Sequence, residues 1–149
     1  MSPEPITILY AEDDPDDRML TADALRESRL ANRLEMVEDG AELLAYLRRE
    51  GRWSDPASSP RPGIILMDLN MPKMDGREAL AAIRADPRLA TIPVVVLTTS
   101  RAQTDITRSY EIGANSYITK PVTFEGLVQV MADLGRYWFE IVQLPATER

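Results

Sequence analysis

Short apolar segments alternate with helix-like segments five times along this 149-residue chain. The apolar segments cover residues 6–11, 33–38, 64–67, 93–98 and 115–119. Short runs of this kind bounded by turn residues are typical of strands, and the segments between them carry apolar residues at helical spacing. Strict alternation of strands and helices predicts an α/β fold with one parallel sheet and helices on both of its faces.

The length of the chain suits one domain. We assign residues 6–142 to it, including a long final helix that begins near Thr123, and we treat residues 1–5 and 143–149 as tails. The loop at 51–63 is long for a connection in a compact domain, which predicts a segment that is either functional or mobile. No apolar run could cross a membrane and no signal peptide is visible, so we expect a cytoplasmic protein without a membrane partner.

The composition excludes several classes of function. The chain has no histidine and no cysteine, which rules out a histidine general base, a Ser-His-Asp triad, a phosphohistidine, thiol catalysis and cysteine-bound metals. The net charge is −7, whereas direct binding of nucleic acid requires a basic surface that neutralises phosphates. Any chemistry therefore depends on carboxylates, hydroxyls and amines.

Polar side chains follow four of the predicted strands at the points where these strands end. Glu12 and Asp13 follow the first strand, Asp68 follows the third, Thr98 ends the fourth, and Lys120 follows the fifth. Because the carboxyl ends of parallel strands meet at one edge of the sheet, where ligands of such folds bind, we expect these side chains to lie together. Each alone has an ordinary alternative as a helix cap or a surface residue, and only their conjunction indicates a site.

Three carboxylates at one edge repel one another unless a cation lies among them. Mg²⁺ suits such a site, since it binds one or two carboxylates together with water and phosphate oxygens. Lys120 adds a mobile positive charge for a phosphate oxygen, and Thr98 adds a hydroxyl donor. The set predicts Mg²⁺-dependent phosphoryl transfer to an aspartate, with Asp68 as the nucleophile.

These motifs resemble the receiver domains of response regulators in two-component signalling, over about residues 6–140. The resemblance is carried by Glu-Asp-Asp at 12–14, Met-Asp-Leu-Asn-Met-Pro-Lys-Met-Asp-Gly at 67–76, Leu-Thr-Thr-Ser at 97–100 and Tyr-Ile-Thr-Lys-Pro at 117–121. It implies a flavodoxin-like sheet with the strand order 2-1-3-4-5.

The resemblance also implies a role for each site residue. Asp68 is expected to accept the phosphoryl group, and Thr98 and Lys120 to bind its oxygens. The implied Mg²⁺ ligands are Glu12, acting largely through water, Asp13, Asp68 and the backbone carbonyl of Asn70. Thr98 and the aromatic Tyr117 are the implied switch residues. The chain is then expected to be a signalling phosphoacceptor that assists its own phosphorylation and dephosphorylation, and not a conventional enzyme.

The expected partner is a histidine kinase, and because no effector domain follows, we expect output through partner binding or phosphate relay. The loop at 51–63, the run at 97–100 and the aromatic-rich end resemble single-domain receivers associated with bacterial and cyanobacterial phytochromes. The last helix carries two apolar stripes, which predict a C2 homodimer through this helix and its neighbours. The first stripe is Leu127, Met131 and Trp138, and the second is Val130, Leu134, Tyr137 and Ile141.

Other functions remain to be weighed against this one. A phosphorylation-independent adaptor and a phosphorelay intermediate both stay open. A phosphatase of the haloacid-dehalogenase type requires Asp-x-Asp after its first strand, whereas this chain has Asp68-Leu69-Asn70 after its third. A flavodoxin requires a phosphate-binding loop after its first strand, where the acidic residues of this chain would repel the flavin phosphate.

Overall fold

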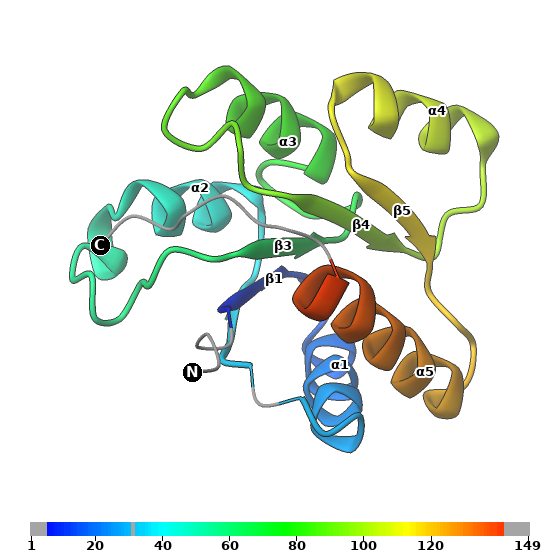
Figure 1. The fold of residues 1–149 in the computed structure, drawn as a ribbon. Helices are drawn as coiled ribbons and strands as arrows, with labels where there is room; N and C mark the ends of the chain where they lie inside the picture. Colours follow the sequence, from blue (N-terminus) through cyan, green and yellow to red (C-terminus); the bar gives the residue numbers. More distant parts are fainter. Residues whose placement is uncertain (1–5, 31, 142–149) are drawn as a thin grey trace.

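The computed structural model describes residues 6–30 and 32–141, which form a five-stranded parallel sheet with the order β2-β1-β3-β4-β5 (Figure 1). Both the parallel sheet and the strand order were predicted and are confirmed. The strands are β1 (Ile8–Ala11), β2 (Leu34–Val37), β3 (Ile64–Met67), β4 (Val94–Thr98) and β5 (Ser116–Thr119). The helices are α1 (Pro15–Glu27), α2 (Gly40–Arg48), α3 (Gly76–Ala85), α4 (Gln103–Ile112) and α5 (Phe124–Leu134).

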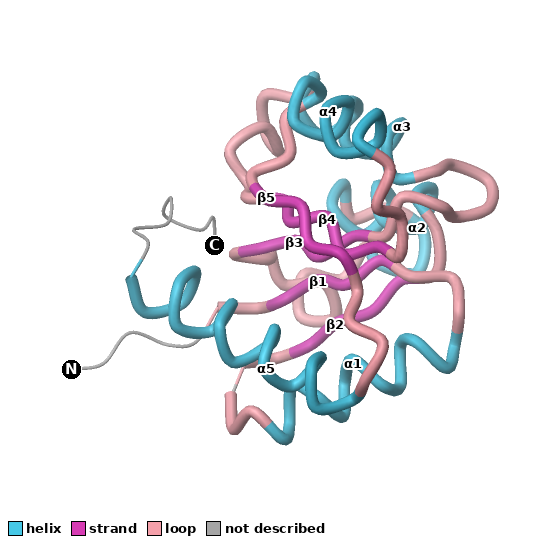
Figure 2. The backbone as a smooth tube through the Cα atoms, turned by 90° about the vertical axis from the view of Figure 1, so that its right-hand side faces the viewer, coloured by secondary structure: helices cyan, strands magenta, loops and turns pink. Residues whose placement is uncertain are grey.

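Each face of the sheet has its own apolar core, because successive strand residues point to opposite sides. Leu9 and Ala11 pack with residues of α2 and α3, whereas Ile8 and Tyr10 pack with residues of α1 and α5. Figure 2 shows α1 and α5 together on one side of the sheet and the other three helices on the opposite side. The central strands β1, β3 and β4 are buried throughout, as continuous apolar runs in parallel sheets require.

Polar side chains cap the starts of most helices at the carboxyl edge of the sheet. In four of the five helices, a side-chain oxygen of the preceding residue accepts a hydrogen bond from a peptide N–H of the first turn. Such caps stabilise a helix start by about 1 kcal/mol each. These caps stabilise the helix starts along the edge of the sheet where the candidate site lies. The capping residues are Asp14, Asp39, Asp75 and Thr123.

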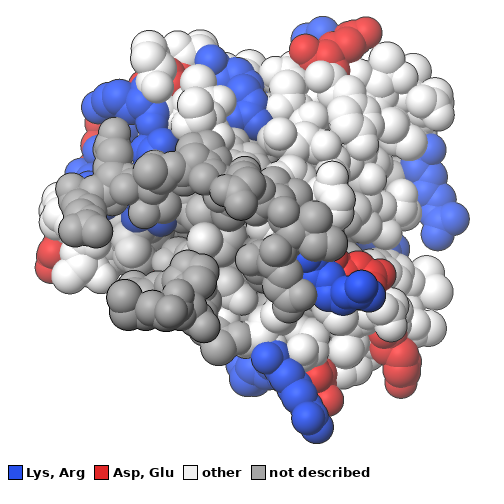
Figure 3. Space-filling view, viewed as in Figure 1, with Lys and Arg blue, Asp and Glu red and all other residues white. Residues whose placement is uncertain are grey.

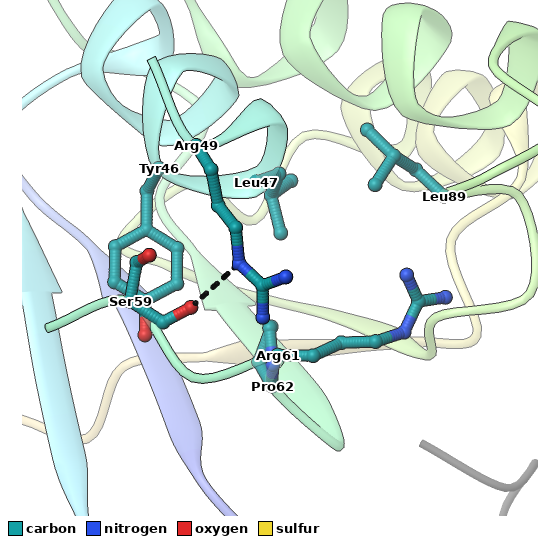
Figure 4. A pocket seen from close by; sticks show the side chains of 7 residues that line it. All are labelled: Tyr46, Leu47, Arg49, Ser59, Arg61, Pro62 and Leu89. Atoms are coloured by element: carbon teal, nitrogen blue, oxygen red, sulfur yellow. Dashed lines mark hydrogen bonds between the residues drawn. The ribbon is translucent and has the colours of Figure 1, made fainter. Parts of the chain in front are cut away.

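The loop at 51–63 enters β3 at the opposite edge of the sheet and is fastened to α2. The Tyr46 hydroxyl donates a hydrogen bond to the Pro60 carbonyl at 2.8 Å, and the rings of Tyr46 and Trp53 pack at a tilt with their centroids 4.8 Å apart. The buried Ser59 hydroxyl lies 2.7 Å from the Trp53 carbonyl oxygen. Figure 4 shows the pocket between this loop and α2, with the Arg49 side chain reaching the Ser59 carbonyl.

The last helix differs from the prediction of two separate stripes. After Leu134 the chain continues as a π-helical segment, Gly135–Ile141, and Gly135 lies so close to Leu30 that a Cβ there would come within 2.7 Å of its side chain. The assignment of Leu134 to the second stripe is wrong, because Leu134 is buried in the core beside Trp138. Tyr137 of that stripe is 54% exposed.

The remaining boundary predictions lie partly outside the described residues. These are the tails at 1–5 and 143–149, residue 142 and the side chain of Ile141. Across the described ranges, no helix has the length and apolar character needed to span a membrane.

Candidate functional site

Asp68 lies at the carboxyl end of the central strand β3, where the Asp68 N–H donates a hydrogen bond to the Ala11 carbonyl of β1 at 3.0 Å. Its side chain is almost buried, with 8% of the residue exposed. One carboxylate oxygen, Oδ1, accepts hydrogen bonds from the Thr98 hydroxyl at 2.7 Å and from the Asn70 N–H at 3.3 Å. The other, Oδ2, accepts a hydrogen bond from Lys120 Nζ at 3.0 Å. The side chain at the end of β4 therefore holds one carboxylate oxygen, and the side chain that follows β5 holds the other.

Lys120 follows β5 and places its ammonium group among three carboxylates. Nζ lies 3.0 Å from Asp68 Oδ2, 3.1 Å from Asp17 Oδ2 and 3.3 Å from Glu12 Oε1. The backbone fixes this position, because the Lys120 N–H donates to the Thr98 carbonyl at 2.7 Å. The structure thus brings together Glu12, Asp68, Thr98 and Lys120, which lie far apart in the sequence.

The geometry sets the charge of each group. Burial and the neighbouring Asp68 raise the pKa of Glu12 to about 9. Burial also opposes ionisation of Asp68, but hydrogen bonds from Glu12, Thr98 and Lys120 outweigh it and lower the pKa of Asp68. Burial opposes the charge of Lys120, but its interactions with Tyr10, Asp68 and Glu12 outweigh burial and raise the pKa of Lys120. At neutral pH, Asp68 is an ionised carboxylate beside a protonated Glu12 and a charged Lys120.

Asp13 and Asn70 are placed differently from the other site residues. Asp13 is exposed and makes no hydrogen bond or ion pair with another described residue. The Asn70 side chain is exposed, and its peptide N–H, not its carbonyl, is the group that contacts Asp68. Among residues 6–30 and 32–141, no three carboxylates gather around one point at metal-ligand spacing. Lys120 lies at the centre of the carboxylates instead.

The donor set nevertheless fits a divalent cation. Glu12 and Asp68 are neighbouring buried carboxyls of which only Asp68 is ionised, and a divalent cation beside them would take the place of the Glu12 proton. Mg²⁺ needs one or two carboxylates and completes its shell with water and backbone oxygens. Glu12, Asp13 and Asp68 supply oxygen ligands of the required kind at one edge of the sheet.

Tyr117 is half-buried on β5 and is tied to the loop between β4 and α4. Its hydroxyl donates a hydrogen bond to the Ser100 carbonyl at 3.0 Å, and its N–H donates to the Tyr110 hydroxyl at 3.1 Å. Ser100 lies two residues after Thr98, so the loop that contacts Tyr117 begins directly after the residue that contacts Asp68.

Sequence reasoning missed two residues beside Lys120. Asp17 lies in the first turn of α1, and its carboxylate accepts a hydrogen bond from Lys120. Its position in the first turn after the first strand was the signal that could have placed it at the site. Tyr10 is fully buried, and burial chiefly raises the pKa of its hydroxyl to about 12, while the charge of Lys120 lowers it. The strand pattern gave no signal for a polar role of Tyr10.

Comparison with known proteins gives one consistent answer. The model of the response regulator receiver domain matches residues 8–132. Response regulator Rcp1 from Synechocystis is 42% identical over 142 residues, which cover 95% of this chain and 95% of that protein.

Two solved structures agree with this match. The phosphorylated cyanobacterial phytochrome response regulator RcpA superposes with a TM-score of 0.87 at 42% identity, covering 96% of this chain and all of that one. The Mn²⁺-bound form of Rcp1 superposes with a TM-score of 0.84 at 42% identity, covering 95% of this chain and all of that one.

Proposed function

The chain belongs to the response regulator receiver domain family, and on that premise we propose that Asp68 accepts a phosphoryl group from the phosphohistidine of a histidine kinase. Phosphorylation-based signalling and relationship to the phytochrome response regulators follow from the comparisons. The observation that carries the assignment to Asp68 is the convergence of Thr98 and Lys120 on its two carboxylate oxygens.

Asp68 supplies the nucleophile because it is already ionised at neutral pH. One of its oxygens attacks the phosphorus, the phosphorus–nitrogen bond to the kinase histidine breaks, and an acyl phosphate forms. Thr98 and Lys120 lie 2.7 and 3.0 Å from the attacking carboxylate, so their hydrogen bonds can pass to phosphoryl oxygens as charge moves outward. These contacts support the proposal that the chain assists its own phosphorylation and dephosphorylation.

A divalent metal belongs to receiver chemistry, and a relative has been crystallised with Mn²⁺. We propose Mg²⁺ for this chain, held by the carboxylates of Glu12, Asp13 and Asp68 and by the backbone carbonyl of Asn70. When bound, the ion supplies neutralising charge for the phosphoryl oxygens. The adjacent, buried carboxyls of Glu12 and Asp68 support this ligand set.

The kinase is proposed to dock on the apolar hollow between α1 and the start of α5, beside the acceptor. This hollow is lined by Leu20, Val122 and Phe124 and reaches Lys120. Leu20 is 45% exposed and Val122 is 93% exposed, an unusual exposure for apolar side chains next to a charged site. Since RcpA is a phytochrome response regulator, we propose a phytochrome-type kinase, which places the protein in the cytoplasm.

The output is proposed to pass through Thr98 and Tyr117 to the surface formed by α4, β5 and α5. A phosphoryl group adds roughly −1.5 to −2 charges and new acceptor oxygens, and these change the interactions of Thr98. The Tyr117 hydroxyl contacts Ser100, two residues after Thr98, so movement of one alters the contacts of the other. The same surface is proposed to form a homodimer.

Phosphoryl transfer from the autophosphorylated kinase domain tests this assignment. Asp68→Asn should abolish transfer, since no carboxylate nucleophile remains. Val122→Asp should slow transfer from the kinase but leave phosphorylation by acetyl phosphate unchanged, because only the former needs docking. Transfer to Asp68→Asn at the wild-type rate would refute the acceptor. Equal slowing of both donors by Val122→Asp would refute the docking surface.

A further inference from the structure

A single carboxylate joins α3 to the loop that follows Thr98 at the end of β4. Asp105 lies in the first turn of α4, and its Oδ1 accepts a hydrogen bond from Arg77 Nη2 of α3 at 2.6 Å. Its other oxygen, Oδ2, accepts a hydrogen bond from the Ser100 hydroxyl at 2.6 Å. Both side chains of the ion pair are about three-quarters buried, at 26% exposure each. Charge-assisted bonds of this length are stronger than neutral ones.

Both ends of this link lead to Asp68. On one side, Arg77 follows Gly76, which lies so close to the Asp68 backbone that a Cβ there would be 2.4 Å from the Asp68 carbonyl oxygen. On the other side, Ser100 lies two residues after Thr98, whose hydroxyl donates to Asp68 Oδ1 at 2.7 Å. The contacts thus form a closed ring that starts at the backbone of the acceptor and returns to its side chain.

The ring also includes the switch aromatic. The Tyr117 hydroxyl donates a hydrogen bond to the carbonyl of Ser100, the residue whose side chain contacts Asp105. Ser100 is therefore fixed from α4 through its hydroxyl and from β5 through its carbonyl. Any force that moves this loop acts on the contacts of Thr98 and Tyr117 together.

We propose that Asp105 is a positioning residue for phosphorylation of Asp68, an inference that rests on the function proposed above. With Arg77, it holds the Ser100 segment so that the Thr98 hydroxyl stays directed at the acceptor. Asp105 touches neither the acceptor nor the phosphoryl group and acts through Ser100 and Thr98. Losing the ion pair frees the loop, and the Thr98 hydroxyl then spends less time in the geometry that phosphoryl transfer needs.

Variants that remove one charge at a time test the ring. In Arg77→Gln and in Asp105→Asn, we expect phosphorylation by acetyl phosphate with Mg²⁺ to slow by about two- to fivefold, the range that a partly exposed ion pair supplies. The double variant should be no slower than either single variant, because both changes break the same link. Arg77→Lys keeps the positive charge and should restore most of the rate. Intact-mass time courses give these rates.

A second readout does not depend on phosphorylation. Fluorotyrosine incorporated into the unphosphorylated protein reports on Tyr117, with the signal assigned through Tyr117→Phe. Both charge-removing variants should shift this signal, whereas Arg77→Lys should leave it in place. The matched control is Arg33→Gln, which removes the 2.8 Å ion pair between Arg33 and Glu35 away from the ring and should change neither readout.

Two results would overturn the proposal. One is that Arg77→Gln and Asp105→Asn each behave like Arg33→Gln in both readouts. The other is that the effect of the double variant equals the sum of the effects of the two single variants. If the wild-type protein gains no phosphoryl group at all, the proposed function fails instead. The Tyr117 signal then shows whether Asp105 and Arg77 hold the Ser100 segment, because these contacts are present in the unphosphorylated protein.

Discussion

Lys120 balances the charge of the site at the scale of single residues. Its side chain is 11% exposed and lies within 3.3 Å of carboxylates from Glu12, Asp17 and Asp68. Carboxylates removed from water in this way are tolerated only when they are paired or protonated. Lys120 pairs with these carboxylates, and Glu12 is protonated, since its pKa is raised to about 9. The unphosphorylated site therefore holds a proton that a bound cation would displace.

Glu12 makes the stability of the metal-free protein depend on pH. Its pKa is about 9 when folded against 4.5 as its ordinary value, so between these values the folded state keeps a proton that the unfolded state has lost. The free energy of unfolding should therefore fall as pH rises from about 5 to 9, by at most about 1.4 kcal/mol per pH unit. Urea unfolding in EDTA across this range measures the slope.

Glu12→Gln should flatten that dependence, because glutamine mimics the protonated carboxyl at every pH. Asp14→Asn is the matched control, since Asp14 is an exposed acid two residues away and should leave the slope unchanged. A wild-type slope that Glu12→Gln does not reduce would contradict the raised pKa.

The sequence predicted most of the site because strand ends can be read from apolar runs. Asp68, Thr98 and Lys120 each end such a run, and a parallel sheet must bring them to one edge. The ion pair of Arg77 with Asp105 could not be predicted, since both residues lie on helix surfaces where a charge is ordinary. Their contact depends on how α3 and α4 pack, which periodicity does not specify.

At the scale of elements, one arginine fastens α3 to its neighbours. The Arg84 guanidinium donates hydrogen bonds to the carbonyls of Gly113, Ala90 and Ile92 at 2.7–3.0 Å. It also donates to the side-chain oxygen of Asn115 at 2.8 Å. One side chain thus joins the end of α3 to the end of α4 and to the segments that enter β4 and β5. Burial lowers the pKa of Arg84, but the group remains charged.

Removing this guanidinium should destabilise the protein. Arg84→Met keeps most of the apolar stem but leaves several carbonyls without donors, and we expect a loss of about 2–3 kcal/mol in the free energy of unfolding. Arg26→Met is a suitable comparison, because Arg26 is 72% exposed and pairs with Asp23 at the surface; it should change stability by under about 0.5 kcal/mol. Equilibrium unfolding in guanidinium chloride measures the stability of both variants. Equal losses of stability in the two variants would rule out the special role of Arg84.

The elements were easier to predict than the packing of the last one. Asp-Gly at 39–40 and 75–76 and Asp-Pro at 14–15 mark helix starts that the structure confirms. The end of α5 was less predictable, because the π-helical segment after Leu134 changes which side chains share a face. The prediction grouped Leu134 with Val130 and Tyr137, whereas Leu134 lies three residues after Met131 and is buried with it in the core.

At the scale of the whole molecule, acidic groups concentrate at the carboxyl edge of the sheet while part of the surface is uncharged. Figure 3 shows uncharged side chains over much of the side of the view where α4 and β5 lie. Large aromatic residues are exposed on α4 and in the segment after α5: Tyr110 is 49% exposed and Tyr137 is 54% exposed. Clusters of this kind mark interaction surfaces.

We expect the protein to form a homodimer through this surface at micromolar concentration. Tyr137→Asp should weaken the dimer, because it places a charge among the apolar groups that association would bury. Met19→Asp alters an equally exposed apolar residue on α1, at 65% exposure, and should leave the dimer intact. Sedimentation velocity distinguishes the species, and a wild-type protein that is monomeric throughout the range would remove the dimer from the account.

The most direct test of the central claim is the intact mass of the protein after incubation with acetyl phosphate. The account predicts a gain of one phosphoryl group that requires Mg²⁺ and is absent in Asp68→Asn. The chain has no histidine or cysteine to accept a phosphoryl group instead. A gain retained by Asp68→Asn would contradict the acceptor. No gain in the wild type would favour a phosphorylation-independent adaptor built on the same fold.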